Sequence, residues 1–191
     1  NSPNLLGWDF DGSDNGGQAW YDLAFAVSPI DEDIIFVGGV NCWKSTDGGQ
    51  SWNINTHWYG ASGTTYMHAD EHMIKYNPLN NYIYSGNDGG LYFSDNNGIN
   101  WTDISDGLHI TQFYSLGVSQ TVQDKVITGS QDNGTFLKTN TTWDAVIGGD
   151  GMECIIDYTN SNIMYGALYY GDIRKSTNGG NSFSSIAPSN N

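Results

Sequence analysis

The fold is decided by the stretch Ser45-Thr46-Asp47-Gly48-Gly49-Gln50-Ser51-Trp52, because this stretch recurs along the chain. It returns as Ser94-Asp95-Asn96-Asn97-Gly98-Ile99-Asn100-Trp101 and as Ser176-Thr177-Asn178-Gly179-Gly180-Asn181-Ser182-Phe183. These three octapeptides are named box turns 1, 2 and 3. A degenerate fourth copy is Lys138-Thr139-Asn140-Thr141-Thr142-Trp143. The closing aromatic residues are 49, 42 and 40 residues apart, a spacing typical of propeller blades of roughly 40–50 residues. We expect the four aromatic residues to occupy matching positions.

Short apolar runs precede each repeat of the box and predict β-strands. The first run of each repeat covers residues 25–29, 74–78, 116–120 and 154–158. The second run ends in glycine and covers residues 34–38, 82–86, 125–129 and 163–166. A third strand is expected before each box and a fourth from its aromatic residue. The sequence therefore predicts an all-β fold, a β-propeller segment of about four four-stranded antiparallel blades.

The repeat also predicts where each blade begins and ends. Residues 1–19 are expected to be the end of a preceding blade or a connector. The expected blades cover residues 20–62, 63–109, 110–147 and 148–191. Because four blades are at the low limit for a propeller, the segment is expected to be part of a larger ring. The remaining blades of the same native chain are then its first expected partner.

Charge excludes several classes of partner. Of the 191 residues, 6 are Lys or Arg and 21 are Asp or Glu, which gives a formal net charge of −15. A phosphate backbone is repelled by such a chain, so nucleic acid is not an expected partner. No stretch approaches the roughly 18 uninterrupted apolar residues of a spanning helix, so membrane insertion is not expected either.

Cys42 and Cys154 lie in different repeats and are expected to be buried apolar residues.

The box turns resemble the Asp-box repeat, also known as the bacterial neuraminidase (BNR) repeat, of β-propellers. The resemblance implies structural roles for the box residues Ser45, Asp47, Gly49, Trp52, Ser94, Asn96, Gly98, Trp101, Ser176, Asn178, Gly180 and Phe183. Three further motifs, at residues 18–23, 68–72 and 148–153, resemble large secreted propeller proteins exported by the type IX secretion system. More distantly, the chain is similar to xyloglucan-cleaving glycoside hydrolases and sortilin-type propellers. A secreted or cell-surface location is the expectation that follows.

Aligning the repeats predicts a polar ring at one mouth of a central channel. The ring residues, at the entry to the innermost strands, are Tyr21, His68, Asp70, His72, Gln112 and Asp150. On a strand, His68, Asp70 and His72 point the same way, so these three residues are the candidates for a metal ion. No cofactor is predicted, and polar lining of a solvated channel explains the same residues. Trp58, Tyr59, Tyr66, Tyr169 and Tyr170 are candidate platforms for carbohydrate.

Catalysis has four candidate carboxylates: Asp70, Asp88, Asp132 and Asp150. An inverting glycoside hydrolase needs two carboxyl groups roughly 6.5–9.5 Å apart. A sialidase is excluded, because that family clamps its substrate with three arginines and this chain contains only Arg174. The leading interpretation is a non-catalytic binding or adhesion module, or export cargo whose partner is the secretion machinery. The alternative is an exported glycoside hydrolase acting on plant-type or other polysaccharides.

Overall fold

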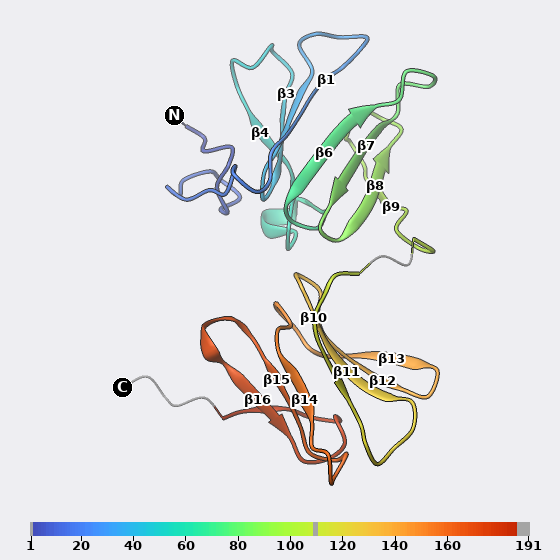
Figure 1. The fold of residues 1–191 in the computed structure, drawn as a ribbon. Coiled ribbons are helices and arrows are strands. Elements are labelled where there is room, and N and C mark those ends of the chain that lie inside the picture. The colour runs from blue at the N-terminus through green and yellow to red at the C-terminus, as the bar shows by residue number, and fades with distance from the viewer. Residues whose placement is uncertain (1, 109–110, 187–191) are drawn as a thin grey trace. The chain divides into compact units, whose positions relative to one another are not determined.

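The computed structural model describes residues 2–108 and 111–186 and is all-β apart from two single-turn 3₁₀ helices, Ala61–Gly63 and Tyr169–Gly171. Residues 1, 109–110 and 187–191, where several predicted boundaries fall, lie outside the described residues. The chain forms two compact units, residues 1–109 and 110–191, each built from two sheets (Figure 1). No helix in the described part of the chain has the length and apolar character that a membrane span requires.

The four sheets are antiparallel meanders in chain order, as expected of propeller blades. Blade 1 contains β1 (Ala24–Val27), β2 (Ile35–Gly38), β3 (Cys42–Ser45), β4 (Asn53–His57) and β5 (Thr65–Tyr66). Blade 2 contains β6 (Glu71–Tyr76), β7 (Ile83–Asn87), β8 (Gly90–Ser94) and β9 (Thr102–Asp103). Blade 3 contains β10 (Phe113–Val118), β11 (Lys125–Ser130), β12 (Gly134–Thr139) and β13 (Thr142–Ile147). Blade 4 contains β14 (Cys154–Ile156), β15 (Met164–Ala167), β16 (Ile173–Ser176) and β17 (Ser184–Ser185).

One strand departs from the four-strand expectation. The two-residue strand β5 lies in the range expected for blade 2, but it pairs in parallel with β4 and so extends blade 1. The 3₁₀ turn Ala61–Gly63 separates β4 from β5. This turn lets the chain cross over before it enters blade 2.

The three box turns share one hydrogen-bond pattern. In box turn 2, Ser94 Oγ accepts the N–H of Gly98 at 2.8 Å and donates to Asn96 Oδ1 at 2.9 Å. Asn96 Oδ1 also accepts the N–H of Asn100 at 2.9 Å. The same contacts occur in box turns 1 and 3. The glycine that closes this ring has φ of +76°, a left-handed conformation that glycine adopts without strain.

The degenerate fourth copy does not form a box turn, but Trp143 keeps the expected position in the strand register. It pairs with Lys138, and Lys138 lies opposite Val126 as the box serines lie opposite Ile35, Ile83 and Met164. Trp52, Trp101 and Phe183 each directly precede the fourth strand of their sheet, whereas Trp143 is the second residue of the longer strand β13. Its side chain is 47% exposed and stacks on Phe113, with ring centroids 6.3 Å apart. Without the serine and glycine of the box, the chain makes a tight hairpin between β12 and β13 at Asn140.

Each unit has its core between its two blades. In unit 1 the core consists of Ala24, Ala26, Phe36, Cys42, Met67, Ile74, Ile83 and Tyr92. In unit 2 it consists of Ile127, Leu137, Cys154, Ile156 and Met164. The two cysteines are buried, as predicted, and both are free thiols. One sheet face of each blade is therefore apolar, and this face packs on the other blade of the same unit.

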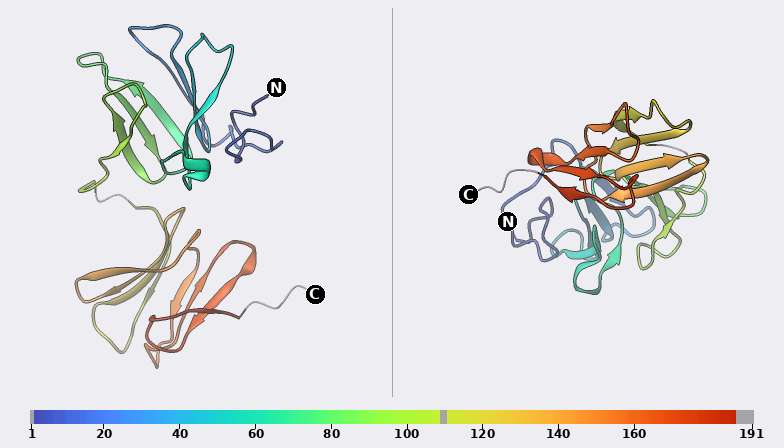
Figure 2. Two further views of the ribbon diagram at one scale, coloured as in Figure 1. Left: turned by 180° about the vertical axis from the view of Figure 1, so that it is seen from behind. Right: turned by 90° about the horizontal axis from the view of Figure 1, so that it is seen from below.

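The N-terminal segment lies beside blade 1, on the side opposite blade 2 (Figures 1 and 2). Asn41 Nδ2 donates to the carbonyls of Gly7 and Trp8 at 3.2 and 3.1 Å. His57 Nε2 lies 3.2 Å from the same Trp8 carbonyl. These contacts attach the segment to blade 1 near the ends of its central strands.

Candidate functional site

Two turns bring polar side chains of unit 1 together at the start of the innermost strands β1 and β6. The Gln18 carbonyl accepts the N–H groups of Tyr21 at 2.7 Å and Asp22 at 3.2 Å, which closes a turn just before β1. Asp70, the residue before β6, has φ of +67°. This left-handed conformation is uncommon for a residue with a side chain. It redirects the chain so that the Asp70 carboxylate meets Gln18.

The first part of the site is a buried carboxyl pair, Asp22 and Asp70. Gln18 Nε2 donates to Asp70 Oδ1 at 2.8 Å and to Asp22 Oδ2 at 3.3 Å, so one amide bridges both carboxyl groups. Asp22 is 1% exposed and Asp70 is 9% exposed. Burial, followed by the neighbouring charges of Asp22 and Asp88, raises the pKa of Asp70 to about 6. Burial also raises the pKa of Asp22. Repulsion between two buried carboxylates favours a shared proton here.

Glu71 adds a third buried carboxyl group behind this pair. It is 1% exposed, and burial raises its pKa to about 8. Its carboxyl group accepts hydrogen bonds from Ser85 Oγ and from Asn87 Nδ2. The group is therefore largely neutral at pH 7, and it is enclosed between the blades rather than presented to a ligand.

The second part of the site is exposed and combines aromatic rings with a carboxylate. Tyr21 Oη donates to Asp88 Oδ2 at 2.6 Å, and His72 Nε2 lies 2.7 Å from Asp88 Oδ1. The Tyr21 and His72 rings meet edge to face at 5.0 Å. Trp20, which is 87% exposed, lies beside Tyr21 with ring centroids 5.9 Å apart. We name Trp20, Tyr21, His72 and Asp88 the aromatic platform.

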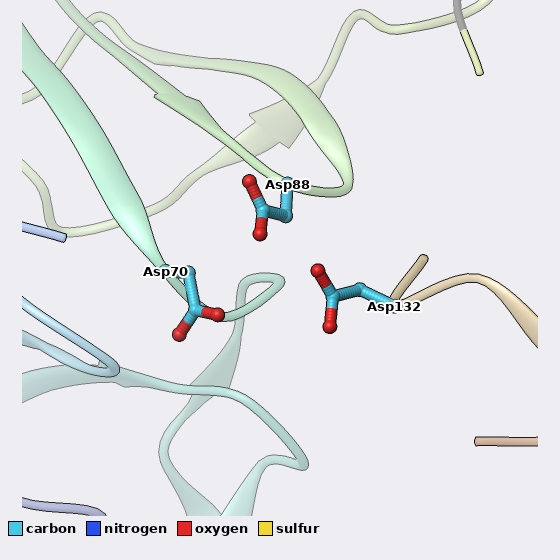
Figure 3. Close-up of side chains that lie close together, drawn as sticks. All are labelled: Asp70, Asp88 and Asp132. Atoms are coloured by element: carbon cyan, nitrogen blue, oxygen red, sulfur yellow. The ribbon is translucent and has the colours of Figure 1, made fainter. Parts of the chain in front are cut away.

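Asp70 and Asp88 approach each other from the start of β6 and from the turn between β7 and β8 (Figure 3). One oxygen of each lies within 4.8 Å of the other. Both are already engaged, Asp70 by Gln18 and Asp88 by Tyr21 and His72. Little room remains between them for the water of an inverting reaction, which needs roughly 6.5–9.5 Å between carboxyl groups.

The proposed metal set does not have the geometry that its prediction required. The strand begins only at Glu71 and carries an irregularity between Glu71 and Met73. His68 and Asp70 therefore lie before the strand, and the side-chain alternation of a strand does not apply to them. His68 Nδ1 lies 3.3 Å from the Ala69 carbonyl, Asp70 meets Gln18, and His72 meets Asp88. Asp70 and His72 both approach Asp88, whereas the nearest polar contact of His68 is a backbone carbonyl.

In unit 2, the corresponding residues also lie at strand entries. Gln112 precedes β10, and its carbonyl accepts the N–H of Gln131 at 3.1 Å. Asp150 lies in the loop before β14, and its Oδ1 accepts the N–H of Asp132 at 3.2 Å. Asp132 has φ of +57° in the turn between β11 and β12. Asp132 and Asp150 are thus neighbours joined by a backbone hydrogen bond.

The candidate carbohydrate platforms are exposed, but they do not form one surface: Tyr66 is a 52% exposed residue of β5, and the other four form two separate pairs. Trp58 and Tyr59 pack edge to face at 4.5 Å, and both contact the His57 ring. Tyr169 and Tyr170 meet at 5.2 Å, and Tyr170 is fully exposed. No carboxylate is hydrogen-bonded to any of these rings in the described residues. They lack the polar partner that the aromatic platform has in Asp88.

Sequence reasoning missed the residues that connect the site. Gln18, Asp22 and Trp20 lie in the motif at residues 18–23, but only Tyr21 was selected there. The available signal was a polar residue directly before a continuous apolar run, as in Asp22 before residues 23–27. Glu71 carried no such signal, because its burial depends on packing between blades.

No family model matches the chain, and no curated protein matches it. Solved structures do resemble it. A GH74 xyloglucanase from Xanthomonas campestris shares 14% identity at a TM-score of 0.38, covering 86% of this chain and 29% of that protein. YCF48 from Cyanidioschyzon merolae shares 12% identity at a TM-score of 0.32, covering 82% and 56%. The extracellular domain of a putative one-component system from B. thetaiotaomicron shares 12% identity at a TM-score of 0.36, covering 87% and 25%.

This chain is a run of propeller blades. It spans between about a quarter and about half of the length of these three proteins. At these identities and TM-scores, none of them assigns an activity to this chain.

Proposed function

We propose that this chain is a non-catalytic binding module of a secreted or cell-surface propeller, and that the aromatic platform binds a neutral, hydroxyl-rich ligand such as a glycan. The observation that carries the proposal is the 87% exposed Trp20 beside Tyr21, with Asp88 held by Tyr21 and His72. An exposed indole offers an apolar face to a sugar ring. A fixed carboxylate next to it accepts hydrogen bonds from hydroxyl groups.

The charge of the chain supports a neutral ligand. With a formal net charge of −15, and with Asp22, Asp70 and Asp88 close to the platform, an anionic ligand is repelled. A glycan without carboxylate or sulfate groups avoids that repulsion. The charge of the chain therefore favours neutral polysaccharides over acidic ones.

The test is calorimetric titration of the chain with a panel of neutral and acidic oligosaccharides, including xyloglucan and β-glucan fragments. We expect binding of at least one neutral member. Trp20→Ala is expected to weaken that binding by about tenfold or more, because the stacking face is lost. Tyr170→Ala is the matched control, since Tyr170 is a fully exposed ring outside the platform. Equal effects of the two substitutions, or no binding to the panel, would contradict the proposal.

A second candidate is an exported glycoside hydrolase, favoured by one observation. Asp70 has a pKa raised to about 6 and lies near Asp88, a combination that suits an acid next to an ionised group. Its 9% exposure and its bond to Gln18 leave a substrate little access, which is why binding ranks first. Release of reducing ends from β-glucan or xyloglucan, abolished in Asp70→Asn and in Asp88→Asn, would establish the hydrolase.

Export and the remaining blades complete the proposal. The four blades belong to a larger propeller, whose further blades are on the same native chain, and type IX secretion carries that protein to the cell surface or beyond. Two observations support a larger propeller: the sheets have the strand order of propeller blades, and their faces are unevenly exposed. The export route is tested by fractionating producing cells that have or lack a functional type IX system. Unchanged surface levels in the export mutant would rule that route out.

A further inference from the structure

Every blade has two faces, and the side chains of its strands alternate between them. We name the face toward the earlier blade in the sequence the preceding face, and the opposite one the following face. The residue paired with the box serine identifies the preceding face, and it is Ile35 in blade 1, Ile83 in blade 2 and Met164 in blade 4. Ile83 and Met164 are 0% exposed within the cores of their units.

The preceding face of blade 1 is only partly covered, because the N-terminal segment lies beside it and leaves the side chains of β1 exposed. By strand register, Phe25 corresponds to Ile74 of blade 2 and to Cys154 of blade 4. Ile74 and Cys154 are 5% and 2% exposed, but Phe25 is 62% exposed and the nearby Val27 is 41% exposed. The same sheet face that is a core in two blades is thus open in the first.

The boundary between blades 1 and 2 shows how such a face is covered. A Cβ placed on Gly98 of box turn 2 would lie 2.7 Å from the Phe36 ring, so glycine lets this ring pack directly on the turn. Lys44 Nζ donates to the carbonyl of Asn97 at 2.7 Å and lies 5.4 Å from the centre of the Phe36 ring. Phe36 and Lys44 are directly paired across β2 and β3.

The boundary between blades 3 and 4 uses the same chemistry. A Cβ on Gly180 of box turn 3 would lie 2.3 Å from Leu137, and Lys125 Nζ donates to the carbonyl of Gly179 at 3.2 Å. In both units, the two central strands of the earlier blade supply one bulky apolar side chain and one lysine. Together they hold the box turn of the later blade.

Box turn 1 has neither contact. A Cβ on Gly49 would meet only Trp52 and Ile35 of its own blade, at 3.6 and 3.8 Å. No hydrogen bond to the Gly48 carbonyl occurs within residues 2–108 and 111–186. The Trp52 indole donates to its own Gly49 carbonyl, at 3.1 Å. In box turn 2, by contrast, the corresponding indole donates to Asn55 of the earlier blade at 2.8 Å.

A hollow of about 560 Å³ lies at this turn, lined by Pro3, Leu6, Leu23, Val37, Gly49 and Trp52. Residues of the N-terminal segment form one wall of the hollow and do not fill it. Its volume is enough for a large side chain, and its lining is mostly apolar. The hollow adjoins Gly49 of box turn 1, and at the corresponding place in box turn 2 the Phe36 ring adjoins Gly98.

Blade 4 carries the complementary group on its following face. Tyr165 and Lys175 are paired across β15 and β16, and Lys175 Nζ lies 5.5 Å from the Tyr165 ring. Lys175 directly precedes the box serine Ser176, as Lys44 precedes Ser45. On the same face Ile155 is 53% exposed and Ile173 is 43% exposed.

We propose that the preceding face of blade 1 is a docking surface for a propeller blade that presents an aromatic ring and a lysine together from its two central strands. The ring enters the hollow at Gly49, and the ammonium binds the Gly48 carbonyl. This inference rests on the proposal that these blades belong to a larger propeller, and it names the chemistry of the blade that covers blade 1. Blade 4 of a second copy has that chemistry, so it serves as the probe.

The experiment is sedimentation velocity of the 191-residue chain over a range of concentrations. We expect head-to-tail association, because each copy carries both halves of the boundary. Phe25→Asp places a charge on the preceding face of blade 1, and Ile155→Asp places a charge on the following face of blade 4. Each variant alone is expected to associate at least about tenfold more weakly, because a charge is placed in an apolar contact. Both residues are more than half exposed, so neither substitution disturbs a core.

Mixing the two variants is the decisive step. The Phe25→Asp variant keeps an intact following face of blade 4, and the Ile155→Asp variant keeps an intact preceding face of blade 1. The mixture is therefore expected to form a one-to-one dimer and nothing larger. Leu79→Asp, in an exposed loop at 91% exposure, is the matched control and should associate like the unaltered chain. Lys175→Met should weaken association while retaining the apolar stem. A monomeric unaltered chain, or a mixture that stays monomeric, would overturn the inference. Glycan binding at Trp20 is measured separately and can survive either result.

Discussion

Among single residues, Glu71 has the most perturbed chemistry. Its pKa is raised from an ordinary value near 4.5 to about 8, because the carboxyl group is buried between blades 1 and 2. The fold therefore favours the protonated form, whereas the unfolded chain ionises above about pH 4.5. It follows that the free energy of unfolding falls as pH rises through this interval and levels off above about pH 8. Asp70 acts in the same direction up to about pH 6.

Glu71→Gln tests this pH dependence. The amide is neutral at every pH, so the decline of the unfolding free energy between about pH 6 and pH 8 should largely disappear. One pKa unit corresponds to about 1.4 kcal/mol. Urea denaturation at several pH values measures the decline. A variant with the same slope as the unaltered chain would show that Glu71 is ionised in the fold.

The box glycines differ in how closely the neighbouring blade packs on them, and alanine substitution measures this difference. Gly98 and Gly49 both have positive φ, +76° and +87°, so alanine is strained at either position. Only at Gly98 does the added methyl group meet a side chain of the neighbouring blade, the Phe36 ring. Gly98→Ala should therefore lower the free energy of unfolding by about 1–3 kcal/mol more than Gly49→Ala. Thermal denaturation of both variants makes the comparison, and equal losses would contradict the packing described for box turn 2.

At the residue scale the sequence was a poor guide to the site. Tyr21, Asp70, His72 and Asp88 were selected, but their partners Gln18 and Asp22 were not. Gln18 and Asp70 are 52 residues apart, and their contact depends on how two blades pack. The left-handed φ of Asp70 depends on the same packing. Neither feature has a local sequence signal.

The elements themselves were more predictable, because the box turn is built from contacts within eight residues. Ser94 Oγ, 2% exposed at the residue level, accepts the N–H groups of Gly98 and Asn96. Ser94→Ala leaves these donors without their acceptor, which should cost about 1–3 kcal/mol of unfolding free energy. Thr139→Ala is the matched control, since the hairpin at Asn140 has no such ring. Comparable losses in both variants would show that the serine ring adds no stability.

The degenerate repeat shows which features of a box depend on its serine and glycines. Lys138 to Trp143 keeps the aromatic residue but lacks the serine and glycines of the box. A tight hairpin then replaces the wider turn, while Trp143 keeps its place opposite Lys138 and is 47% exposed. The aromatic spacing therefore predicts the strand register, and the serine and glycines decide the form of the turn.

For the whole molecule, periodicity alone predicted the all-β blade architecture, since a repeat of strands and turns leaves few other folds. The identity of the covered and uncovered faces was not predictable. Phe25 and Cys154 occupy the same register position, yet one is 62% exposed and the other 2%. Their difference arises from which neighbour each blade has.

We expect the aromatic platform to bind glycans and not to cleave them. Following the Trp20 indole N–H in two-dimensional NMR spectra during titration with the oligosaccharide panel tests both parts of this expectation. Reducing ends are measured in the same samples, and the Trp20 signal is assigned by its loss in Trp20→Phe. The account predicts a saturable shift of the Trp20 signal with no release of reducing ends. Release of reducing ends, or saturable shifts of other indole signals while Trp20 stays unchanged, would contradict it.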